Sequence, residues 1–241
     1  GGDSIWIYDV SRGLPTRFTF DASANTSPVW SPDGRSIVFS SNRKGRRDLY
    51  RKAVDSVRAE ELVYADNLDK FPTSWSADGK LLLYYTATIN SKTGEDLWAL
   101  PLTPERPGDA LKPFLVLQTP FIERYGQFSP DGRWIAYLST ESQRAEIYVA
   151  PFPPLPSRPG GKRQISTAGS TFTQPLWRQD GKELFYLSPD QRLMAADVAI
   201  KAGTLEVGAV SPLFTLNNDA INLVFDASAD GQRFLVRTSP E

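Results

Sequence analysis

The chain has 241 residues, 40% of them hydrophobic, which is enough for a sizeable core in one all-β domain. Lys and Arg total 27 against 28 for Asp and Glu, so no overall field draws the protein to nucleic acid or to an anionic membrane. The chain has no Cys and no His, which excludes disulfides, thiolate chemistry, histidine metal ligands and Ser/His/Asp or Cys/His catalysis.

A short motif, an aromatic residue followed by Ser-Pro-Asp-Gly or a variant of it, occurs five times. The copies are Trp30–Gly34, Trp75–Gly79, Phe128–Gly132, Trp177–Gly181 and Ala227–Gly231. Their aspartates Asp33, Asp78, Asp131, Asp180 and Asp230 lie 45, 53, 49 and 50 residues apart, the period of a repeat built from one small β-sheet per unit. The fifth copy has Ala227 in the aromatic position, so we expect Phe225 to fill that space.

Each motif predicts the inner half of a β-sheet. The aromatic residue ends a first strand, Asp-Gly forms a tight turn, and a short apolar run follows as a second strand buried on both faces. These runs are 36–40, 81–85, 134–138, 183–187 and 234–236. Third strands are predicted at 48–50, 96–98, 146–148 and 192–194, and fourth strands at 61–64, 114–117, 163–166 and 212–214. The pattern is typical of β-propeller blades.

Counting the strands predicts how the repeat series ends. The fifth pair of inner strands has no outer pair after it, but residues 3–8 match a third strand and residues 16–20 a fourth. We therefore expect one domain, a five-bladed β-propeller of four-stranded antiparallel blades, at about 22–66, 67–118, 119–167, 168–216 and 217–241 completed by 1–20. Such sharing closes the ring and removes open sheet edges. The alternative is an arc of a larger propeller that closes or assembles with another chain.

The repeats resemble a known family. Residues 27–35, with 37–43 and 48–50, are similar to the TolB-like, WD-like propeller repeat, and nearly the whole chain follows it. Residues 15–20, 127–134 and 181–187 further resemble the propellers carried C-terminally by bacterial eukaryotic-like serine/threonine kinases, notably of Acidobacteria. That resemblance implies a sensing or binding domain that follows a membrane span and lies outside the cytoplasm, at the cell surface or in the periplasm.

No catalytic signature is found in the chain. There is no Gly-rich phosphate loop before a Lys-bearing strand, no His-Arg-Asp loop and no Gly-x-Ser-x-Gly elbow. We therefore expect a non-catalytic module that binds a protein, peptide or glycan, with no cofactor, no nucleic acid and no insertion of this domain into the membrane. The alternative is the propeller of a hydrolase, either the gating domain of a peptidase or a carboxylate glycosidase.

Several conspicuous residues have structural explanations. The five Asp-Gly aspartates suit turn formation better than a metal ring, so no metal site is expected. Trp30, Trp75, Phe128 and Trp177 are expected to pack between blades rather than to form a stacking platform. The basic run 42–47 is interpreted as a solvated hairpin tip, with an anion contact as the alternative. The proline-rich run 151–159 is interpreted as an extended connection.

Two sets of residues are candidates for a functional site. A glycosidase needs two carboxyls about 5 to 9.5 Å apart, and Asp66, Asp69, Glu123 and Asp219 lie near the starts of first strands. In a propeller those starts, with the adjoining loops, line the mouth of the central channel. The predicted mouth residues are Asn25, Lys70, Arg124, Tyr125, Phe172, Gln174 and Asn222. A water-filled channel without a ligand is the alternative.

Overall fold

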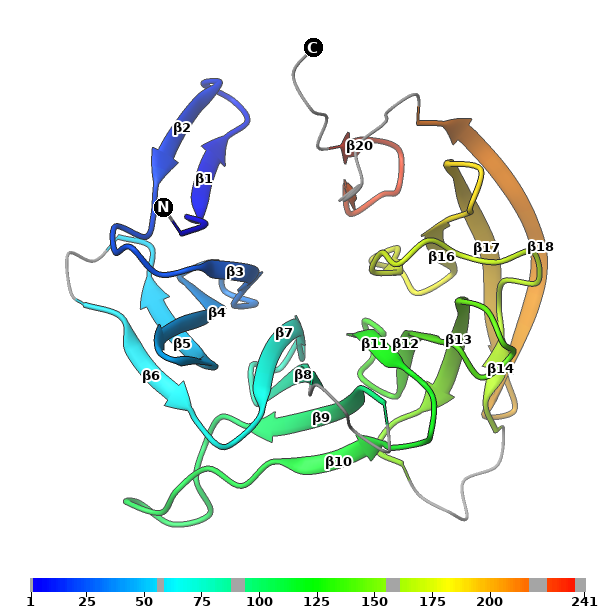
Figure 1. Ribbon diagram of the computed structural model, residues 1–241. Coiled ribbons are helices and arrows are strands. Elements are labelled where there is room, and N and C mark those ends of the chain that lie inside the picture. Colours follow the sequence, from blue (N-terminus) through cyan, green and yellow to red (C-terminus); the bar gives the residue numbers. More distant parts are fainter. Residues whose placement is uncertain (1, 56–58, 88–93, 155–160, 217–224, 237–241) are drawn as a thin grey trace. The chain divides into compact units, whose positions relative to one another are not determined.

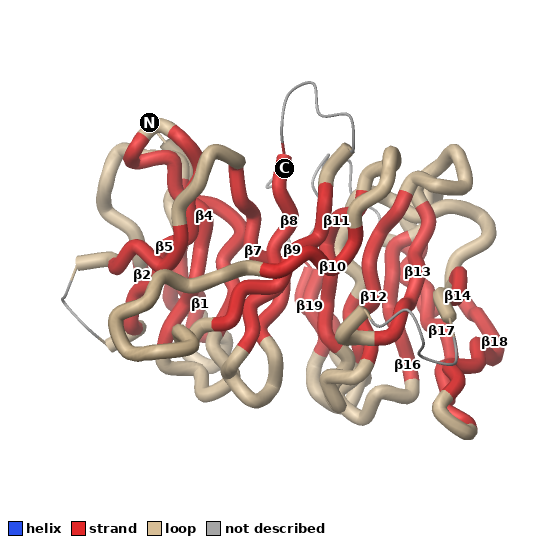
Figure 2. The backbone as a smooth tube through the Cα atoms, turned by 90° about the horizontal axis from the view of Figure 1, so that it is seen from below, coloured by secondary structure: helices blue, strands red, loops and turns tan. Residues whose placement is uncertain are grey.

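The computed structural model describes the chain except for residues 1, 56–58, 88–93, 155–160, 217–224 and 237–241. The described residues form strands, turns and loops and no helix (Figure 2), so no helix among them could cross a membrane. The chain divides into two compact units: an N-terminal unit of residues 1–91 and 98–114, and a C-terminal unit of residues 92–97 and 115–241.

Three sheets come first along the chain (Figure 1). A two-stranded sheet consists of β1 (Trp6–Asp9) and β2 (Leu14–Arg17). The next sheet consists, in order, of β3 (Asn25–Trp30), β4 (Ser36–Lys44), β5 (Arg46–Ala53) and β6 (Glu61–Tyr64). The third consists of β7 (Asp69–Trp75), β8 (Leu81–Ala87), β9 (Asp96–Pro101) and β10 (Phe114–Leu117).

Three further sheets follow. One consists of β11 (Glu123–Phe128), β12 (Trp134–Ser139), β13 (Glu146–Pro151) and β14 (Arg163–Gln164). The next consists of β15 (Leu176–Trp177), β16 (Glu183–Leu187), β17 (Arg192–Lys201) and β18 (Thr204–Thr215). The last is a pair, β19 (Phe225–Ala227) and β20 (Phe234–Val236). The predicted all-β class and its four-stranded antiparallel sheets are confirmed.

The outer strands of the fourth repeat are longer than predicted. The sequence predicts short strands at 192–194 and 212–214, whereas β17 has 10 residues and β18 has 12. The reason is a tight turn at Ala202 and Gly203, both with positive φ, which lets Lys201 pair directly with Thr204. In the preceding repeat, the predicted strand 163–166 is shorter, at Arg163–Gln164.

The Asp-Gly motif makes the predicted turn between the first and second strands of a sheet. In the first copy the Ser31 hydroxyl donates to Asp33 Oδ1 at 2.6 Å, and the Gly34 amide donates to the Ser31 carbonyl at 2.9 Å. Gly34 has a φ of 68°, a conformation that side chains disfavour. The hydroxyl of Ser31 also accepts from the Ser36 amide at 2.9 Å, so the carboxylate and the hydroxyl together organise the hydrogen bonds of the turn.

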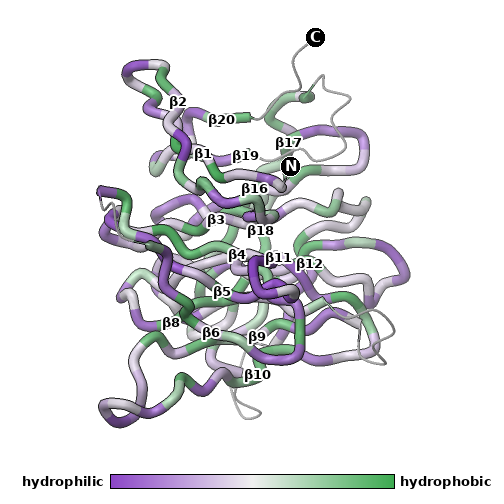
Figure 3. Tube along the Cα trace, turned by 60° about the vertical axis from the view of Figure 1, so that its left-hand side comes forward, coloured by the Kyte–Doolittle hydropathy of each residue, from purple (hydrophilic) through white to green (hydrophobic). Residues whose placement is uncertain are grey.

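Among the described residues, four clusters of buried apolar side chains each join two neighbouring sheets. Hydrophobic residues concentrate in the strands and hydrophilic residues in most loops (Figure 3). Ile5 and Phe18 pack against Phe39 and other residues of the β3–β6 sheet. Three further clusters join the β3–β6 sheet to the β7–β10 sheet, the β11–β14 sheet to the β15–β18 sheet, and the β15–β18 sheet to the β19–β20 pair.

The aromatic residues that end the first strands pack unequally. Phe128 is buried, and Trp75 and Trp177 pack against the clusters beside them. Trp30, in contrast, exposes 47% of its surface, so the predicted packing between blades is not seen for this side chain. Phe225 is 6% exposed in the last cluster, as predicted for the repeat that has Ala in the aromatic position.

The N-terminal residues adopt the local structure of an outer strand pair. The Phe18 amide donates to the Ile5 carbonyl at 2.8 Å, and the Ile5 amide donates to the Thr19 hydroxyl at 2.9 Å. In the β11–β14 sheet the same contacts recur at 2.8 Å between Ile165 and Ile147, and at 2.8 Å from the Ile147 amide to the Ser166 hydroxyl. Residues 3–20 therefore have the local hydrogen bonds of an outer strand pair, but the strands are Trp6–Asp9 and Leu14–Arg17 instead of the predicted 3–8 and 16–20.

Candidate functional site

Lys70, at the start of β7, is buried and fully engaged. Its side chain is 0% exposed, and its ammonium lies 3.2 Å from Asp48 Oδ1 and 2.7 Å from Asp66 Oδ1. The ammonium also donates to the Leu68 carbonyl at 2.5 Å and faces the ring of Tyr64 at 5.7 Å. A desolvated charge needs such partners. Lys70 therefore links strands β5 and β7 from the interior instead of offering a donor to solvent.

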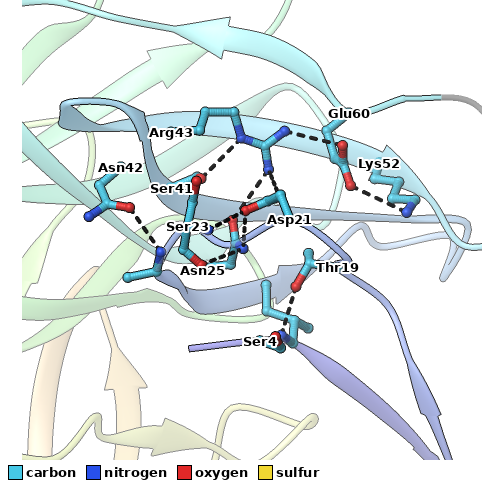
Figure 4. A network of polar contacts seen from close by, with 12 residues as sticks. Ser4, Thr19, Asp21, Ser23, Asn25, Ser41, Asn42, Arg43, Lys52 and Glu60 are labelled. Carbon is cyan, nitrogen blue, oxygen red and sulfur yellow. Dashed lines mark hydrogen bonds and ion pairs between the residues drawn. The ribbon is translucent and has the colours of Figure 1, made fainter. Parts of the chain in front are cut away.

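Asn25, at the start of β3, lies inside a polar network centred on Arg43 (Figure 4). Its amide donates to Asp21 Oδ1 at 3.1 Å and to the Ser23 carbonyl at 3.1 Å, and its oxygen accepts from Arg43 at 3.3 Å. Arg43 bonds Asp21 at 2.9 Å and Glu60 at 3.1 Å. The network fastens the segment that follows β2 to the β3–β6 sheet.

The basic run 42–47 is only partly the solvated tip that the sequence predicts. Arg43 lies over the ring of Tyr50 at 4.3 Å, so this cation is committed to the network of Asn25. Arg47 donates to the Thr26 hydroxyl at 3.0 Å and lies 5.5 Å from the ring of Phe71. Two of the arginines therefore hold the hairpin in place, while Lys44 and Arg46 are exposed.

One position recurs at the start of three first strands. Asn25 lies opposite Ser41, Lys70 opposite Thr86, and Glu123 opposite Ser139. Each of these hydroxyl residues comes seven residues after the glycine of its Asp-Gly motif, and all six side chains belong to buried residues. The repeat equivalent of Lys70 is thus Glu123 and not Arg124. Sequence reasoning could have found this by counting from the glycine.

Glu123 is a buried carboxyl with only half of its oxygens satisfied. It is 1% exposed. Its Oε1 accepts from the Thr119 hydroxyl at 2.5 Å and from the Ser139 hydroxyl at 3.5 Å, whereas Oε2 is buried without a hydrogen-bond partner. Burial raises the pKa of Glu123 to about 7, against the opposing hydrogen bond from Thr119 and with the help of the Asp96 and Glu141 charges.

Arg124 is a predicted site residue that remains partly accessible to solvent. Its guanidinium forms two bonds with the carboxylate of Glu95 and lies 5.6 Å from the ring of Phe172. The Arg124 side chain is 26% exposed and Phe172 is 49% exposed. The structure therefore brings two of the predicted mouth residues into one surface cluster, which we call the Arg124 cluster and define as Glu95, Arg124 and Phe172.

The remaining predicted mouth residues differ in their surroundings. Tyr125 is half-buried against the cluster between the β11–β14 and β15–β18 sheets, and its φ of 58° lies at a register shift of β11. Gln174 is half-buried in the segment before β15. Asn222 lies outside the described residues, as does Asp219.

Two of the four carboxyl groups considered for glycosidase chemistry, Asp66 and Asp69, have structural partners. Asp66 pairs with Lys70 at 2.7 Å, and Asp69 Oδ1 accepts from the Arg47 amide at 2.9 Å. Both belong to the N-terminal unit, whereas Glu123 belongs to the C-terminal unit. Across the described ranges no three Asp or Glu side chains gather as a metal site.

Another buried acid, Glu146, lies at the start of β13 and shows the role of an acidic residue at this end of a sheet's third strand. It is 0% exposed and accepts hydrogen bonds from Ser166, from Arg144 at 2.7 Å and from the Gly169 amide at 3.0 Å. Asp48, the third residue of β5, and Asp96, the first residue of β9, are also buried. These acids tie the third strand to the segment that leads into the next sheet.

The C-terminal unit has hollows at the opposite strand ends. One, of about 630 Å³, lies beside the Asp-Gly turns of the β11–β14 and β15–β18 sheets. Several of its charged lining residues are already paired: Arg133 with Asp131 at 2.8 Å, and Arg178 with Glu183 at 2.8 Å. Strands β11 and β15 begin at the predicted mouth and end at these turns, so the hollow is not the predicted site.

Comparison with known proteins supports the fold. Residues 1–95 match the model of the PD40 family, the TolB beta propeller domain. The chain is 35% identical over 86 residues to an uncharacterized protein of Agrobacterium fabrum and 33% identical over 95 residues to the uncharacterized peptidase YuxL of Bacillus subtilis. These alignments cover 35% and 39% of this chain but only 29% and 14% of the relatives.

The structural likeness extends further than the sequence likeness. TolB from Acinetobacter baumannii superposes with a TM-score of 0.66 at 20% identity, over 95% of this chain and 52% of that one. At this identity the match concerns the fold alone. The protein therefore has an all-β fold similar to TolB propellers, and it spans about half of that TolB chain and less than a third of the two curated relatives.

Proposed function

We propose that this TolB-like chain is a non-catalytic binding or sensing module, and that the Arg124 cluster is where it binds a peptide segment of a partner protein. The supporting observation is an aromatic ring, Phe172, that is 49% exposed while Arg124 lies over it. Arg and aromatic side chains are the residues that most often carry binding energy at protein interfaces. Phe121, 40% exposed in the loop before β11, adds apolar surface near the same strand end.

The charge of the Arg124 cluster favours a peptide over a strongly anionic ligand. Glu95 already neutralises Arg124, so the guanidinium can share hydrogen bonds with a backbone carbonyl or a carboxylate without presenting an unbalanced charge. A ligand that buries the exposed face of Phe172 and accepts a hydrogen bond from Arg124 needs an apolar group next to a carbonyl. A peptide with a large apolar side chain has both.

A displayed peptide library tests the proposal. We expect the wild-type protein to enrich peptides that Phe172→Ala fails to retain, while the matched variant Phe214→Ala, at a similarly exposed ring on β18, retains them. Enrichment that is equal for wild type and Phe172→Ala would contradict the proposed site. Turnover of a peptide or glycan substrate by the purified chain would contradict a non-catalytic role.

We further propose that the fold is a closed five-bladed propeller whose last blade combines β19–β20 with β1–β2. Residues 3–20 already have the hydrogen bonds of outer strands, and each of the two pairs forms a sheet of only two strands. Both pairs carry apolar side chains that such a blade would bury: Trp6 is 57% exposed, Tyr8 57% and Leu235 61%. Trp30 fits the same arrangement, because its equivalents Trp75 and Trp177 pack against the sheet that precedes them.

The register of the other sheets gives a direct test. Val38 and Ala136, each four residues after the motif glycine, lie opposite Arg51 and Val149. In the proposed blade the same register would bring Leu235 opposite Ile7, with Cβ atoms about 5 Å apart.

The chain has no Cys, so Ile7→Cys with Leu235→Cys introduces the only two thiols. We expect an intramolecular disulfide under mild oxidation, and none for the control pair Leu14→Cys with Leu235→Cys, because Leu14 lies on the outer strand β2. A covalent dimer would indicate a ring completed between chains, and no cross-link would reject closure.

The parent protein that we propose is a bacterial receptor-like kinase with this module outside the cytoplasm, a context that rests on the sequence resemblance described above. The second candidate is the propeller of a hydrolase, which the 33% identity to a peptidase over 95 residues favours. The flanking coding sequence separates the two. A kinase domain and a membrane span upstream would support the first, and a hydrolase domain next to the propeller would support the second.

A further inference from the structure

In the C-terminal unit, strands β17 and β18 continue beyond the strand that precedes them. β16 pairs with β17 only between Leu193 and Asp197, whereas β17 pairs with β18 as far as Lys201. Residues 198–201 and 204–207 therefore form a two-stranded hairpin that extends past β16 (Figure 1). In the described part of the chain, no strand pairs with residues 198–201 on the side that β16 occupies. One edge of β17 is free at these residues.

The free edge of β17 carries outward-facing backbone groups. The Val198 amide donates to the Lys182 carbonyl at 2.8 Å, so Val198 directs its backbone toward the β16 side. Alternate residues of an antiparallel strand face the same neighbour, which directs the amide and the carbonyl of Ile200 to this side as well. Among the described residues, no hydrogen bond outside the strand pairs uses the Val198 carbonyl or either group of Ile200. One donor and two acceptors are therefore available to an added strand.

The hollow of about 630 Å³ lies along this free edge. Three successive residues of β17, Val198, Ala199 and Ile200, line it. Because successive side chains of a strand point to opposite faces of the sheet, a hollow that contacts three in a row runs along the edge of the strand and not over one face. The Asp-Gly turns at Asp131 and Asp180 also line the hollow. The space beside the free backbone groups is therefore open.

A smaller hollow of about 110 Å³ adjoins the first at Val198 and Ile200, which line both. An apolar cavity of this size has room for one aliphatic side chain. The indole N–H of Trp177 is buried and has no hydrogen-bond partner among the described residues, so a bound peptide that brings a carbonyl here would satisfy it. The apolar lining of this hollow consists of Trp134, Trp177, Val198, Ile200 and Leu205.

The charges around the larger hollow nearly cancel. Four acidic and three basic residues line it, and several of them already form ion pairs, such as Arg178 with Asp180 at 2.7 Å. Neither an acidic nor a basic ligand is therefore strongly attracted. This balance is complementary to an uncharged segment.

We propose that residues 198–201 form a β-augmentation site, where an uncharged extended segment of a partner protein adds to the free edge of β17 and places one aliphatic side chain in the smaller hollow. Four residues of a strand span about 13 Å, too short an edge for the roughly 800 Å² per partner of a stable dimer, which favours a short segment over a second copy of the chain. The site lies at the opposite strand ends from the Arg124 cluster, so it is additional to the function proposed above.

NMR titration of the whole chain with N-acetyl-leucine methylamide tests the proposal, because this probe has the backbone groups of a strand and one aliphatic side chain. We expect the amide and methyl signals of Ile200 to shift, with a dissociation constant of about 1 mM. N-acetyl-glycine methylamide, which lacks the side chain, should bind at least about 10-fold more weakly.

Two substitutions of Ile200 separate the backbone from the hollow. Ile200→Pro removes the outward amide, which an edge strand tolerates, and should weaken binding of the leucine probe about 2- to 10-fold. Ile200→Asp puts a carboxylate beside the apolar lining and should weaken it more than about 10-fold. Val210→Asp is the matched control, since Val210 on β18 is 40% exposed against 39% for Ile200 and does not line either hollow. It should bind as the wild type does.

The wild-type protein alone keeps the test decisive if a variant fails to fold. Equal affinity for the leucine and glycine probes would overturn the proposal, as would shifts at Phe172 without shifts at Ile200. A wild-type dimer that Ile200→Asp abolishes and Val210→Asp retains would also overturn it, because the edge would then be occupied by a second copy of the chain.

Discussion

Replacing Lys70 by Met tests whether buried charge holds neighbouring sheets together. Met keeps the length and the apolar stem of the side chain but removes the ammonium. Asp48, which is 5% exposed, then loses its cation in a place where water cannot replace it, and the Leu68 carbonyl loses its donor. Removing one partner of a buried pair typically costs about 3 to 5 kcal/mol. Since Lys70 is 0% exposed and contacts three acceptors, we expect a loss within this range.

Urea denaturation at pH 7 measures the effect. With a urea dependence of about 2 kcal/mol per molar, the midpoint should fall by about 2 M. Lys80→Met is the matched control, because Lys80 is 76% exposed and 3.7 Å from Asp78, a type of pair that contributes less than about 1 kcal/mol. Adding Asp48→Asn to Lys70→Met should recover part of the loss. A midpoint for Lys70→Met equal to that of Lys80→Met would refute the reasoning.

Two further substitutions test how closely single positions are packed. Gly94→Ala should destabilise the chain by at least about 2 kcal/mol more than Gly79→Ala. Both glycines have a φ of 75°. A Cβ at Gly94 would lie 2.2 Å from the Phe121 carbonyl oxygen, whereas a Cβ at Gly79 would have none of the described atoms within 4 Å. Thermal unfolding of the two variants measures the difference, and equal melting temperatures would contradict it. Phe128→Ala should cost about 3 to 5 kcal/mol, because Phe128 is only 6% exposed. A loss of less than about 1 kcal/mol in urea denaturation would contradict this.

The sequence predicts the sheets well because each repeat contains an Asp-Gly pair that marks the turn between its first two strands. The Asp-Gly pair requires a tight hairpin, and the apolar run after it can only be a buried strand, so the inner strands follow directly. The outer strands depend on what they pack against, and their lengths were therefore less predictable. The two-residue turn at Ala202 and Gly203 extends β17 and β18 far beyond the aliphatic residues that marked them.

The side chains of the candidate site were harder to predict from the sequence than the strands. Position along the chain identified the starts of first strands, but not which side chain points inward. Irregular pairing decides this: Tyr125 adopts a positive φ at the register shift in β11, so Glu123 lies inside and Arg124 reaches the surface. The partners of Lys70 come from strand β5 and from the loop before β7, and a list of residue types does not contain that pairing.

The apolar clusters among the described residues have a consequence for how the chain tolerates change. Each of them joins two adjacent sheets, so in this part of the chain the stabilising free energy of apolar burial is divided among local junctions. A substitution in one junction should leave the free energy of local unfolding of the other junctions unchanged. Single repeats can therefore change in sequence without destabilising the others. One example is the equivalent position at the start of three first strands. It carries an amide in Asn25, an ammonium in Lys70 and a carboxyl in Glu123.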